Sequence, residues 1–171
     1  MLFETRNGRL LAVIDATEVT AIRTAAVSGV ATRLLAREDA SELAFLGAGT
    51  QARKHLEAML EARHIKRVRV WNRSLENAER FAENTAGRYH LEVKAVASAR
   101  EAAAAADIIC TTTSAVEPVL AGGWIAPGTH INAVGACIPT ARELDSEAVV
   151  KSKLYVDRRE STLAEAGDFI I

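Results

Sequence analysis

Short apolar runs alternate with amphipathic stretches over most of this chain. The runs have the length of strands and lie at residues 42–46, 66–71, 91–96, 107–112, 130–134 and 153–157. The stretches between them, such as 51–60 and 75–86, repeat apolar residues at the spacing of a helix face. Strands that alternate with helices form a parallel sheet with helices on both faces. The pattern therefore predicts a doubly wound α/β fold with six strands.

The first 36 residues depart from this alternation. Asn7-Gly8 lies between two apolar segments and predicts a β-hairpin over residues 1–15, because both residues tolerate a positive φ. A helix is expected over residues 17–36, and its buried stripe would consist of Ile22, Ala25, Ala26, Val30 and Leu34. A hairpin alone is marginally stable in water, so we expect it to pair with a segment outside this sequence.

The segment after the first apolar run reads Gly47-Ala48-Gly49-Thr50-Gln51-Ala52. Between a strand and a helix, this G-x-G-x-x-A spacing is typical of dinucleotide binding. Gly47 would allow the tight turn, Gly49 would leave room for a pyrophosphate, and Ala52 would let the helix lie close to the strand. The N–H groups at the helix N-terminus would then bind the phosphates.

The end of the second predicted strand discriminates between nicotinamide cofactors. NAD enzymes usually place Asp or Glu there to bind the ribose hydroxyls, whereas this chain has Asn72-Arg73-Ser74. A guanidinium, an amide and a hydroxyl at a helix N-terminus suit the 2′-phosphate of NADP(H), which we expect in preference to NAD(H). The alternative is that Ser74 only caps the helix and that Arg73 is solvated.

Hydroxyl-bearing residues follow the fourth predicted strand. Loops at the carboxyl ends of such strands line the cofactor cleft, and Thr113 is the best placed of these residues for contact. Thr111 and Thr112 are equally well explained by the preference of threonine for strands. The end of the fifth predicted strand, at residues 133–136, should lie beside the nicotinamide.

Composition excludes several classes of partner. The 171 residues are 49% apolar and 25% charged, and the net charge is −1, so neither a nucleic acid nor a membrane surface is expected to bind. No apolar run reaches the ~18 residues of a membrane helix. The two cysteines, Cys110 and Cys137, fit a reducing compartment, and we expect a cytoplasmic protein.

The other chemistry-bearing residues are expected to have structural roles. Cys110 lies within a predicted strand and should belong to the core, whereas Cys137 has no His nearby in the sequence to activate it. The four histidines show no ligand spacing, so no metal site is predicted, and His55 is expected at the surface. Asp107 begins a strand and is expected to cap the preceding helical region.

Several motifs in combination resemble those of one family. They are T-A-I-R-T-A-A-V-S at 20–28, G-A-G-T-Q-A at 47–52, V-W-N-R-S at 70–74, G-T-H-I-N-A-V-G-A at 128–136 and R-E-L-D at 142–145. Together they resemble the ornithine cyclodeaminase/mu-crystallin family, and in particular its mu-crystallin branch, over essentially the whole chain. The resemblance implies a homodimeric oxidoreductase that uses NADPH to reduce cyclic ketimines such as pyrroline-2-carboxylate or piperideine-2-carboxylate.

The resemblance also implies roles for individual residues. It carries the pyrophosphate site to Gly47, Gly49, Thr50 and Ala52, the 2′-phosphate site to Asn72, Arg73, Ser74 and Asn77, and the nicotinamide side to Thr113, Ser114 and Val134. Spacing alone favours Arg23 as a surface residue whose stem covers apolar groups. The resemblance instead implies that Arg23 contacts the cofactor or the substrate carboxylate.

Two departures from the family pattern limit what the resemblance implies. Cys137 stands where ornithine cyclodeaminases carry a catalytic Asp, and a thiol is a poor substitute for a carboxylate base. A reductase is therefore favoured, while an ornithine cyclodeaminase, an amino-acid dehydrogenase or a non-catalytic mu-crystallin-like binding protein remain alternatives.

The second departure is length, because members of the family are much longer than this chain. We therefore expect a central fragment, in which residues 1–36 are a remnant of the substrate and dimerisation domain. Residues 37–171 would form the Rossmann dinucleotide-binding domain.

Overall fold

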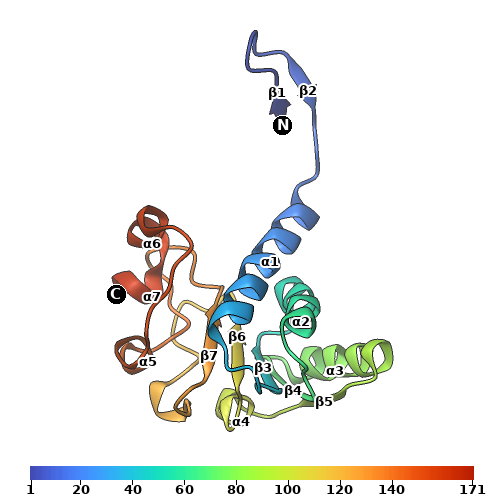
Figure 1. The fold of residues 1–171 in the computed structure, drawn as a ribbon, viewed down its shortest axis with the longest axis vertical. Helices are drawn as coiled ribbons and strands as arrows, with labels where there is room; N and C mark the ends of the chain where they lie inside the picture. Colours follow the sequence, from blue (N-terminus) through green and yellow to red (C-terminus); the bar gives the residue numbers. More distant parts are fainter.

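The computed structural model describes all 171 residues. It begins with the antiparallel hairpin of β1 (Leu2–Phe3) and β2 (Leu10–Ala12), which stands away from the body of the molecule, and continues into the long helix α1 (Thr17–Leu35) (Figure 1). The remaining elements are β3 (Glu42–Leu46), α2 (Thr50–Ala62), β4 (Arg67–Trp71), α3 (Leu75–Tyr89), β5 (Glu92–Ala95), α4 (Ala99–Ala103), β6 (Ile108–Thr111), the 3-10 helix η1 (Gly122–Trp124), β7 (His130–Ala133), α5 (Ser146–Lys151), α6 (Arg159–Glu165) and α7 (Gly167–Ile170).

The sheet confirms the predicted doubly wound fold. Its five strands are all parallel and lie in the order β5-β4-β3-β6-β7, so that chain order reverses on either side of β3. In the register of the sheet, Phe45 of β3 pairs with Val70 of β4 and with Cys110 of β6. A ligand crevice is expected beyond the carboxyl ends of β3 and β6, where the order reverses.

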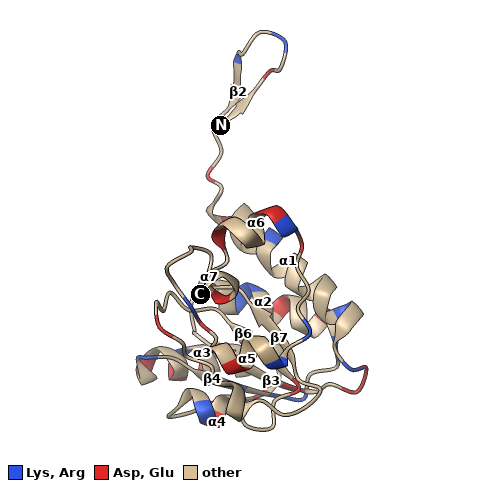
Figure 2. Cartoon of the chain, turned by 90° about the vertical axis from the view of Figure 1, so that its left-hand side faces the viewer, with Lys and Arg blue, Asp and Glu red and all other residues tan.

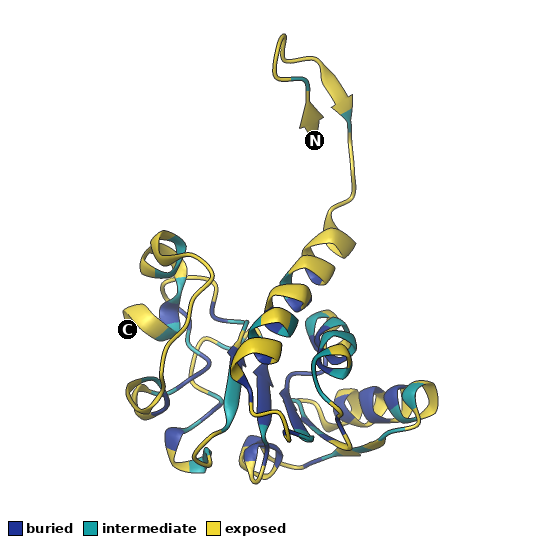
Figure 3. Ribbon diagram, viewed as in Figure 1, coloured by how far each residue is buried: buried dark blue, intermediate teal, exposed yellow.

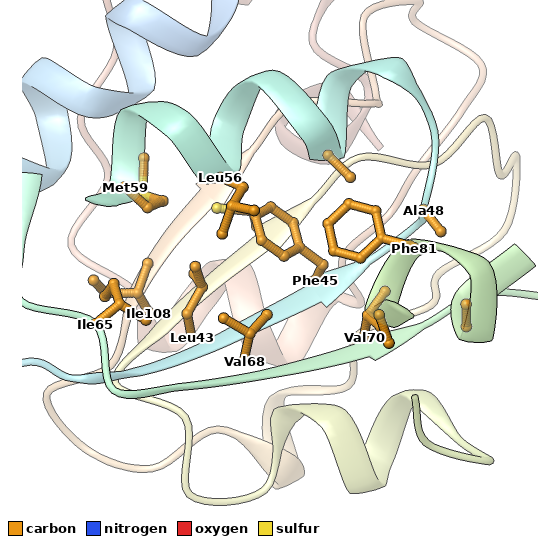
Figure 4. Packing of buried hydrophobic residues seen from close by; sticks show 14 of the residues in the cluster. Leu43, Phe45, Ala48, Leu56, Met59, Ile65, Val68, Val70, Phe81 and Ile108 are labelled. Atoms are coloured by element: carbon orange, nitrogen blue, oxygen red, sulfur yellow. The ribbon is translucent and has the colours of Figure 1, made fainter. Parts of the chain in front are cut away.

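Each face of the sheet has its own core. Leu43 and Phe45 of β3 belong to a cluster of 16 buried residues beneath α2 and α3, which Figure 4 shows, whereas Ala44 and Leu46 belong to a cluster of 11 on the opposite face. The Phe45 and Phe81 rings lie 5.7 Å apart between centroids and are tilted by 56°, at a separation typical of aromatic pairs. Alternation along the strand, combined with burial of both faces, explains why β3 reads as an almost unbroken apolar run.

The predicted sixth strand is wrong. Residues 153–157 run as irregular, exposed chain between α5 and α6, and none of their backbone groups pairs with β7. Leu154, Tyr155 and Val156 each remain about half exposed. The alternating pattern of this segment resembles a strand, but a strand also needs a neighbour whose N–H and C=O groups it can meet.

The predicted apolar stripe of the first helix is also wrong, except at Ala25, which is the one residue of the five that is buried. Small and polar residues of α1, among them Ala25 and Ser28, face the body of the protein, while Ile22, Val30 and Leu34 are exposed (Figure 3). Close packing of α1 on α2 explains this choice, because a Cβ on Gly29 would lie 3.2 Å from the Cβ of Ala58. Larger side chains on that face would push the two helices apart.

The surface carries charges of both signs. Figure 2 shows Lys and Arg interspersed with Asp and Glu along the elements, in agreement with the small net charge of −1. None of the helices combines the length and the apolar character needed to cross a bilayer.

Candidate cofactor site

The sheet brings the sequence-predicted cofactor residues to one edge. Gly47 follows β3, Asn72 follows β4, Thr113 follows β6 and Val134 follows β7, and the carboxyl ends of these parallel strands lie side by side. Residues that are far apart in the sequence therefore meet at the edge where α/β folds of this order bind their ligands.

The glycine turn after β3 uses its two glycines differently. Gly47 has a φ of 108°, and a Cβ on it would lie 2.6 Å from the carbonyl oxygen of Thr112. Its N–H donates to the carbonyl of Trp71 at 2.8 Å, which ties the turn to β4. A Cβ on Gly49 would instead meet no atom within 4 Å. Gly47 is thus required by the fold, whereas Gly49 leaves open space next to the turn.

The N-terminus of α2 lacks a side-chain cap, as do those of α1, α6 and α7, whereas three helices of the chain possess one. Ser74 caps α3, Ser98 caps α4 and Asp145 caps α5, each by accepting a hydrogen bond from a backbone N–H of the first turn. At α2 the capping position is Gly49, and no side chain accepts from the first turn. Ala52 is fully buried, so this end of the helix lies close to β3. The arrangement leaves N–H groups and positive dipole for an anion.

The predicted 2′-phosphate residues lie together where α3 begins, but most of them hold the turn itself. Asn72 Oδ1 accepts from the N–H of Ala48 at 3.4 Å, and its Nδ2 donates to the carbonyl of Ser74 at 3.1 Å. Ser74 Oγ accepts from the N–H of Asn77, as the capping alternative predicted. Arg73 is exposed and makes no hydrogen bond or ion pair within the chain. Of this group, the guanidinium of Arg73 is the cation available to a ligand.

The nicotinamide side contains a residue that the sequence analysis missed. Glu143 is fully buried, and its carboxylate accepts hydrogen bonds from Thr113 and Gly135, in the loops after β6 and β7. Burial raises the pKa of Glu143, and the hydrogen bonds from Thr113 and Gly135 oppose that rise. The hydroxyl of Thr113 is thereby committed to Glu143, while Ser114 is exposed and Val134 is half-buried at the same edge.

Nothing local in the sequence identifies Glu143 as a site residue. It sits in the R-E-L-D motif at 142–145, which the sequence analysis used only for the family resemblance. Its partners lie 30 and 8 residues away along the chain. In the sequence, Glu143 is only a charged residue directly before the apolar Leu144. The structure is needed to show that both residues are buried and which groups the Glu143 carboxylate binds.

Two other predictions about single residues are wrong. His55 is fully buried rather than at the surface: its Nδ1 lies 2.8 Å from the carbonyl oxygen of Gln51 and its Nε2 lies 2.9 Å from Ser28 Oγ. A carbonyl only accepts, so Nδ1 carries the proton and Nε2 accepts from the serine hydroxyl. Burial lowers the pKa of His55. The surface prediction failed because α1 covers this face of α2.

Asp107 does not cap the helical region that precedes it. Its carboxylate accepts from the backbone N–H groups of Ser41 and Glu42, at 2.9 and 3.0 Å, and pairs with Arg37. Burial favours the protonated form, but these hydrogen bonds and the Arg37 charge outweigh it, so the pKa of Asp107 is lowered. The residue therefore anchors the start of β3, the strand that leads into the glycine turn.

Three candidates remain, namely the two cysteines and Arg23. Cys110 is fully buried in β6, as predicted, and burial raises its pKa to about 12. Cys137 is exposed just after β7. Arg23 is exposed on α1 and makes no hydrogen bond or ion pair within the chain. Its role toward a cofactor or substrate remains a prediction.

The fold and the carboxyl edge of the sheet together define a dinucleotide-binding α/β domain. The strand order of the parallel sheet reverses at β3, and the glycine turn after β3 leads into a helix without a side-chain cap. Comparison with known protein families matches residues 1–170 to the ornithine cyclodeaminase/mu-crystallin family. The chain belongs to that family, as the motifs predicted.

Individual relatives agree with this assignment. The ketimine reductase mu-crystallin of Mus musculus is 49% identical over 171 residues, which are 100% of this chain and 53% of the relative. The Delta(1)-pyrroline-2-carboxylate reductase of Bacillus cereus is 40% identical over 169 residues, 98% of this chain and 52% of the relative. The chain thus spans about half the length of the curated relatives it matches.

Solved structures show the same fold with nicotinamide cofactors. The Thermococcus litoralis Delta(1)-pyrroline-2-carboxylate reductase in complex with NADH and L-proline is 48% identical and superposes with a TM-score of 0.94, over 98% of this chain and 52% of that one. A dimeric archaeal alanine dehydrogenase with bound NAD is 36% identical, with a TM-score of 0.87 over 95% of this chain and 50% of that one.

Proposed function

We propose that this chain is the NADP(H)-binding core of an oxidoreductase that reduces cyclic ketimines, such as pyrroline-2-carboxylate or piperideine-2-carboxylate. The observation that carries the proposal is the uncapped N-terminus of α2 behind the open space at Gly49. An anion fits there, and the similarity to ketimine and pyrroline-2-carboxylate reductases supplies the class of reaction.

The residues of the edge would divide the cofactor between them. Gly47, Gly49, Thr50 and Ala52 would form the pyrophosphate site together with the N–H groups of α2. Thr113, Ser114 and Val134 would line the nicotinamide side, beyond β6 and β7. When bound, the reduced nicotinamide supplies the hydride for the C=N carbon of the imine.

The preference for NADP(H) rests on the turn after β4. Arg73 offers an unpaired guanidinium, while Asn72, Ser74 and Asn77 fix the turn around it, and no carboxylate stands directly after the strand. The solved relatives named above hold NADH or NAD, so this preference is a specific proposal for this chain. A phosphate on the ribose would gain charge-assisted hydrogen bonds from Arg73.

Residues outside the dinucleotide domain would serve the substrate and the assembly. We propose that Arg23 contacts the substrate carboxylate or the cofactor, and that residues 1–36 belong to a substrate and dimerisation domain while 37–171 form the Rossmann domain. The exposed apolar side chains of α1 and of the hairpin support a further partner for this part of the chain. A cytoplasmic homodimer is the expected form.

The activity is tested on the protein expressed with any coding sequence that flanks these residues. Consumption of NADPH should be followed with pyrroline-2-carboxylate and piperideine-2-carboxylate, and compared with reactions on ornithine and alanine with NAD or NADP. Rapid reduction of a cyclic imine with little turnover of ornithine supports the proposal. Turnover of alanine or ornithine without imine reduction would support the dehydrogenase or cyclodeaminase alternative, and binding without any turnover would support a binding protein.

A further inference from the structure

A buried carboxylate joins the two loops that leave the carboxyl ends of β6 and β7. Glu143 Oε1 accepts from the backbone N–H and the hydroxyl of Thr113, and its Oε2 accepts from the backbone N–H of Gly135, all at 2.6 Å. Backbone pairing between the strands ends where the N–H of Val134 donates to the carbonyl of Thr111. Beyond that point, the Glu143 carboxylate continues the connection between the two loops.

The surrounding chain is shaped to admit this carboxylate. A Cβ on Gly135 would lie 2.5 Å from the carboxyl carbon of Glu143 and 2.2 Å from the carbonyl oxygen of Thr113. Gly135 therefore allows the loop after β7 to approach both groups. An ionised carboxylate only accepts hydrogen bonds, and both backbone partners here can only donate, so the group and its site are complementary.

A second carboxylate holds Glu143 in place. Asp168 Oδ1 accepts from the backbone N–H groups of Glu143 and Leu144, at 2.8 and 2.9 Å. The preceding Gly167 lies so close to the segment that a Cβ on it would be 1.9 Å from the carbonyl oxygen of Ala141. The C-terminal helix α7 therefore closes against the segment that presents Glu143.

We propose that Glu143 is a positioning residue for the nicotinamide half of the cofactor site, a role that rests on the function proposed above. Its carboxylate turns the N–H groups of Thr113 and Gly135 into the protein interior and fixes the distance between the two loops. Ser114 and Val134, the neighbours of these two anchored residues, are thereby held at the edge where the nicotinamide ring is to lie.

The position of Glu143 makes its effect selective. The adenosine half of the proposed site is formed by β3, β4 and the N-termini of α2 and α3, and the Glu143 carboxylate makes no hydrogen bond with any of these elements. Loosening the loops after β6 and β7 should therefore weaken a ligand that carries nicotinamide, and leave a ligand that lacks it unaffected.

The test compares two ligands on the Glu143→Gln variant of this chain. The ligands are NADPH and 2′-phospho-ADP-ribose, which lacks only the nicotinamide, and both are titrated by calorimetry. The glutamine keeps the size of the side chain and one acceptor oxygen, but its NH₂ group opposes the N–H of Gly135. We expect NADPH to bind at least tenfold more weakly and 2′-phospho-ADP-ribose to bind within twofold of wild type. The fluorescence enhancement of the reduced nicotinamide should fall in parallel.

Matched variants separate positioning from general loss of structure. Glu83→Gln makes the same charge change on the exposed face of α3, and Val68→Ala weakens the core far from the loops. Neither should change the ratio of the two affinities. If Glu143→Gln does not fold, Thr113→Val removes the hydroxyl that donates to the carboxylate and that accepts from the N–H of Ala115, and it should give the same selective loss at smaller size.

The possible results are distinct. An equal loss for both ligands, or no loss for either, would overturn the role of Glu143 while leaving the cofactor site intact. If wild type binds neither ligand, the proposed function itself is wrong, which is a different result from a failure of the positioning role. A loss confined to NADPH, absent in both matched variants, supports it.

Discussion

The two halves of the cofactor edge are built in opposite ways. The turn after β3 is local: Gly47, Gly49 and the first turn of α2 are consecutive in sequence, and their chemistry is that of backbone groups. The loops after β6 and β7 are held by Glu143, which lies 30 residues beyond Thr113 along the chain. The proposed phosphate site thus follows from a short motif, whereas the loops of the proposed nicotinamide side are joined by a carboxylate that is distant in the sequence.

Removing the distant carboxylate should produce the largest effect. Glu143→Ala leaves two backbone N–H groups and a hydroxyl without acceptors in the interior, and we expect the free energy of unfolding to fall by about 4 kcal/mol. Urea denaturation measures this change. The exposed Glu83→Ala should stay within about 0.5 kcal/mol of wild type. Similar values for the two variants would show that Glu143 does not hold the loops.

Substitutions of the two glycines in the turn after β3 should have different effects. Gly47→Ala places a side chain at a φ of 108° and against the carbonyl of Thr112, so we expect a loss of about 3 kcal/mol in unfolding free energy. Gly49→Ala enters open space and should cost less than about 1 kcal/mol, while it weakens cofactor binding. Thermal unfolding with and without NADPH measures both. Equal stability of the two variants would contradict the division of roles.

The turn after β4 should control cofactor choice, and a substitution there should have a smaller effect than those at Glu143 and Gly47. Arg73→Ala removes the available guanidinium and should weaken NADPH binding by about 2 kcal/mol, or roughly 30-fold, because hydrogen bonds to charged groups have this strength. The affinity for NADH should not change. Calorimetric titration with both cofactors measures the difference, and a parallel loss for NADH would assign Arg73 to general phosphate attraction instead.

The smallest effect concerns the contact between α1 and α2. Because burial lowers the pKa of His55, the unfolded chain takes up a proton before the folded chain does as the pH falls. Stability from this residue is present above its ordinary pKa of about 6.5 and is lost as the pH falls from there through the folded-state value.

Two variants isolate this dependence. His55→Gln should cost about 1 kcal/mol at neutral pH through the lost Ser28 hydrogen bond, and this difference should shrink at lower pH. The exposed His64→Gln should follow wild type throughout. Denaturant midpoints measured across the pH range test this pH dependence. A stability difference between His55→Gln and wild type that does not change with pH would contradict the lowered pKa of His55.

The sequence predicted those parts of the molecule that local pattern determines. The parallel sheet of β3, β4, β5, β6 and β7 followed from the alternation of apolar runs and helical stretches, whereas the order of its strands did not. The tight turn at Gly47 followed from the glycine spacing, and its positive φ is one that glycine adopts without strain. The capping role of Ser74 was foreseen as an alternative and is present.

The errors share a physical cause, which is contact between distant segments. The exposed Ile22, Val30 and Leu34 of α1 were expected inside because apolar character was taken as the sign of burial, yet close helix packing selected smaller residues. His55 was expected outside because its partner Ser28 lies 27 residues away. Residues 153–157 have the alternation of a strand, but no neighbouring strand receives them. Glu143 went unnoticed for the same reason.

The most direct test of the account measures cofactor choice at the turn itself. Trp71 ends β4, accepts from the N–H of Gly47 through its carbonyl, and is the residue before Asn72. Because the chain has two tryptophans, Trp124→Phe leaves Trp71 as the only one, and its fluorescence can be titrated with NADPH and with NADH. We expect NADPH to change the signal at concentrations at least tenfold lower than those at which NADH does. Equal responses, or no response to either cofactor, would contradict it.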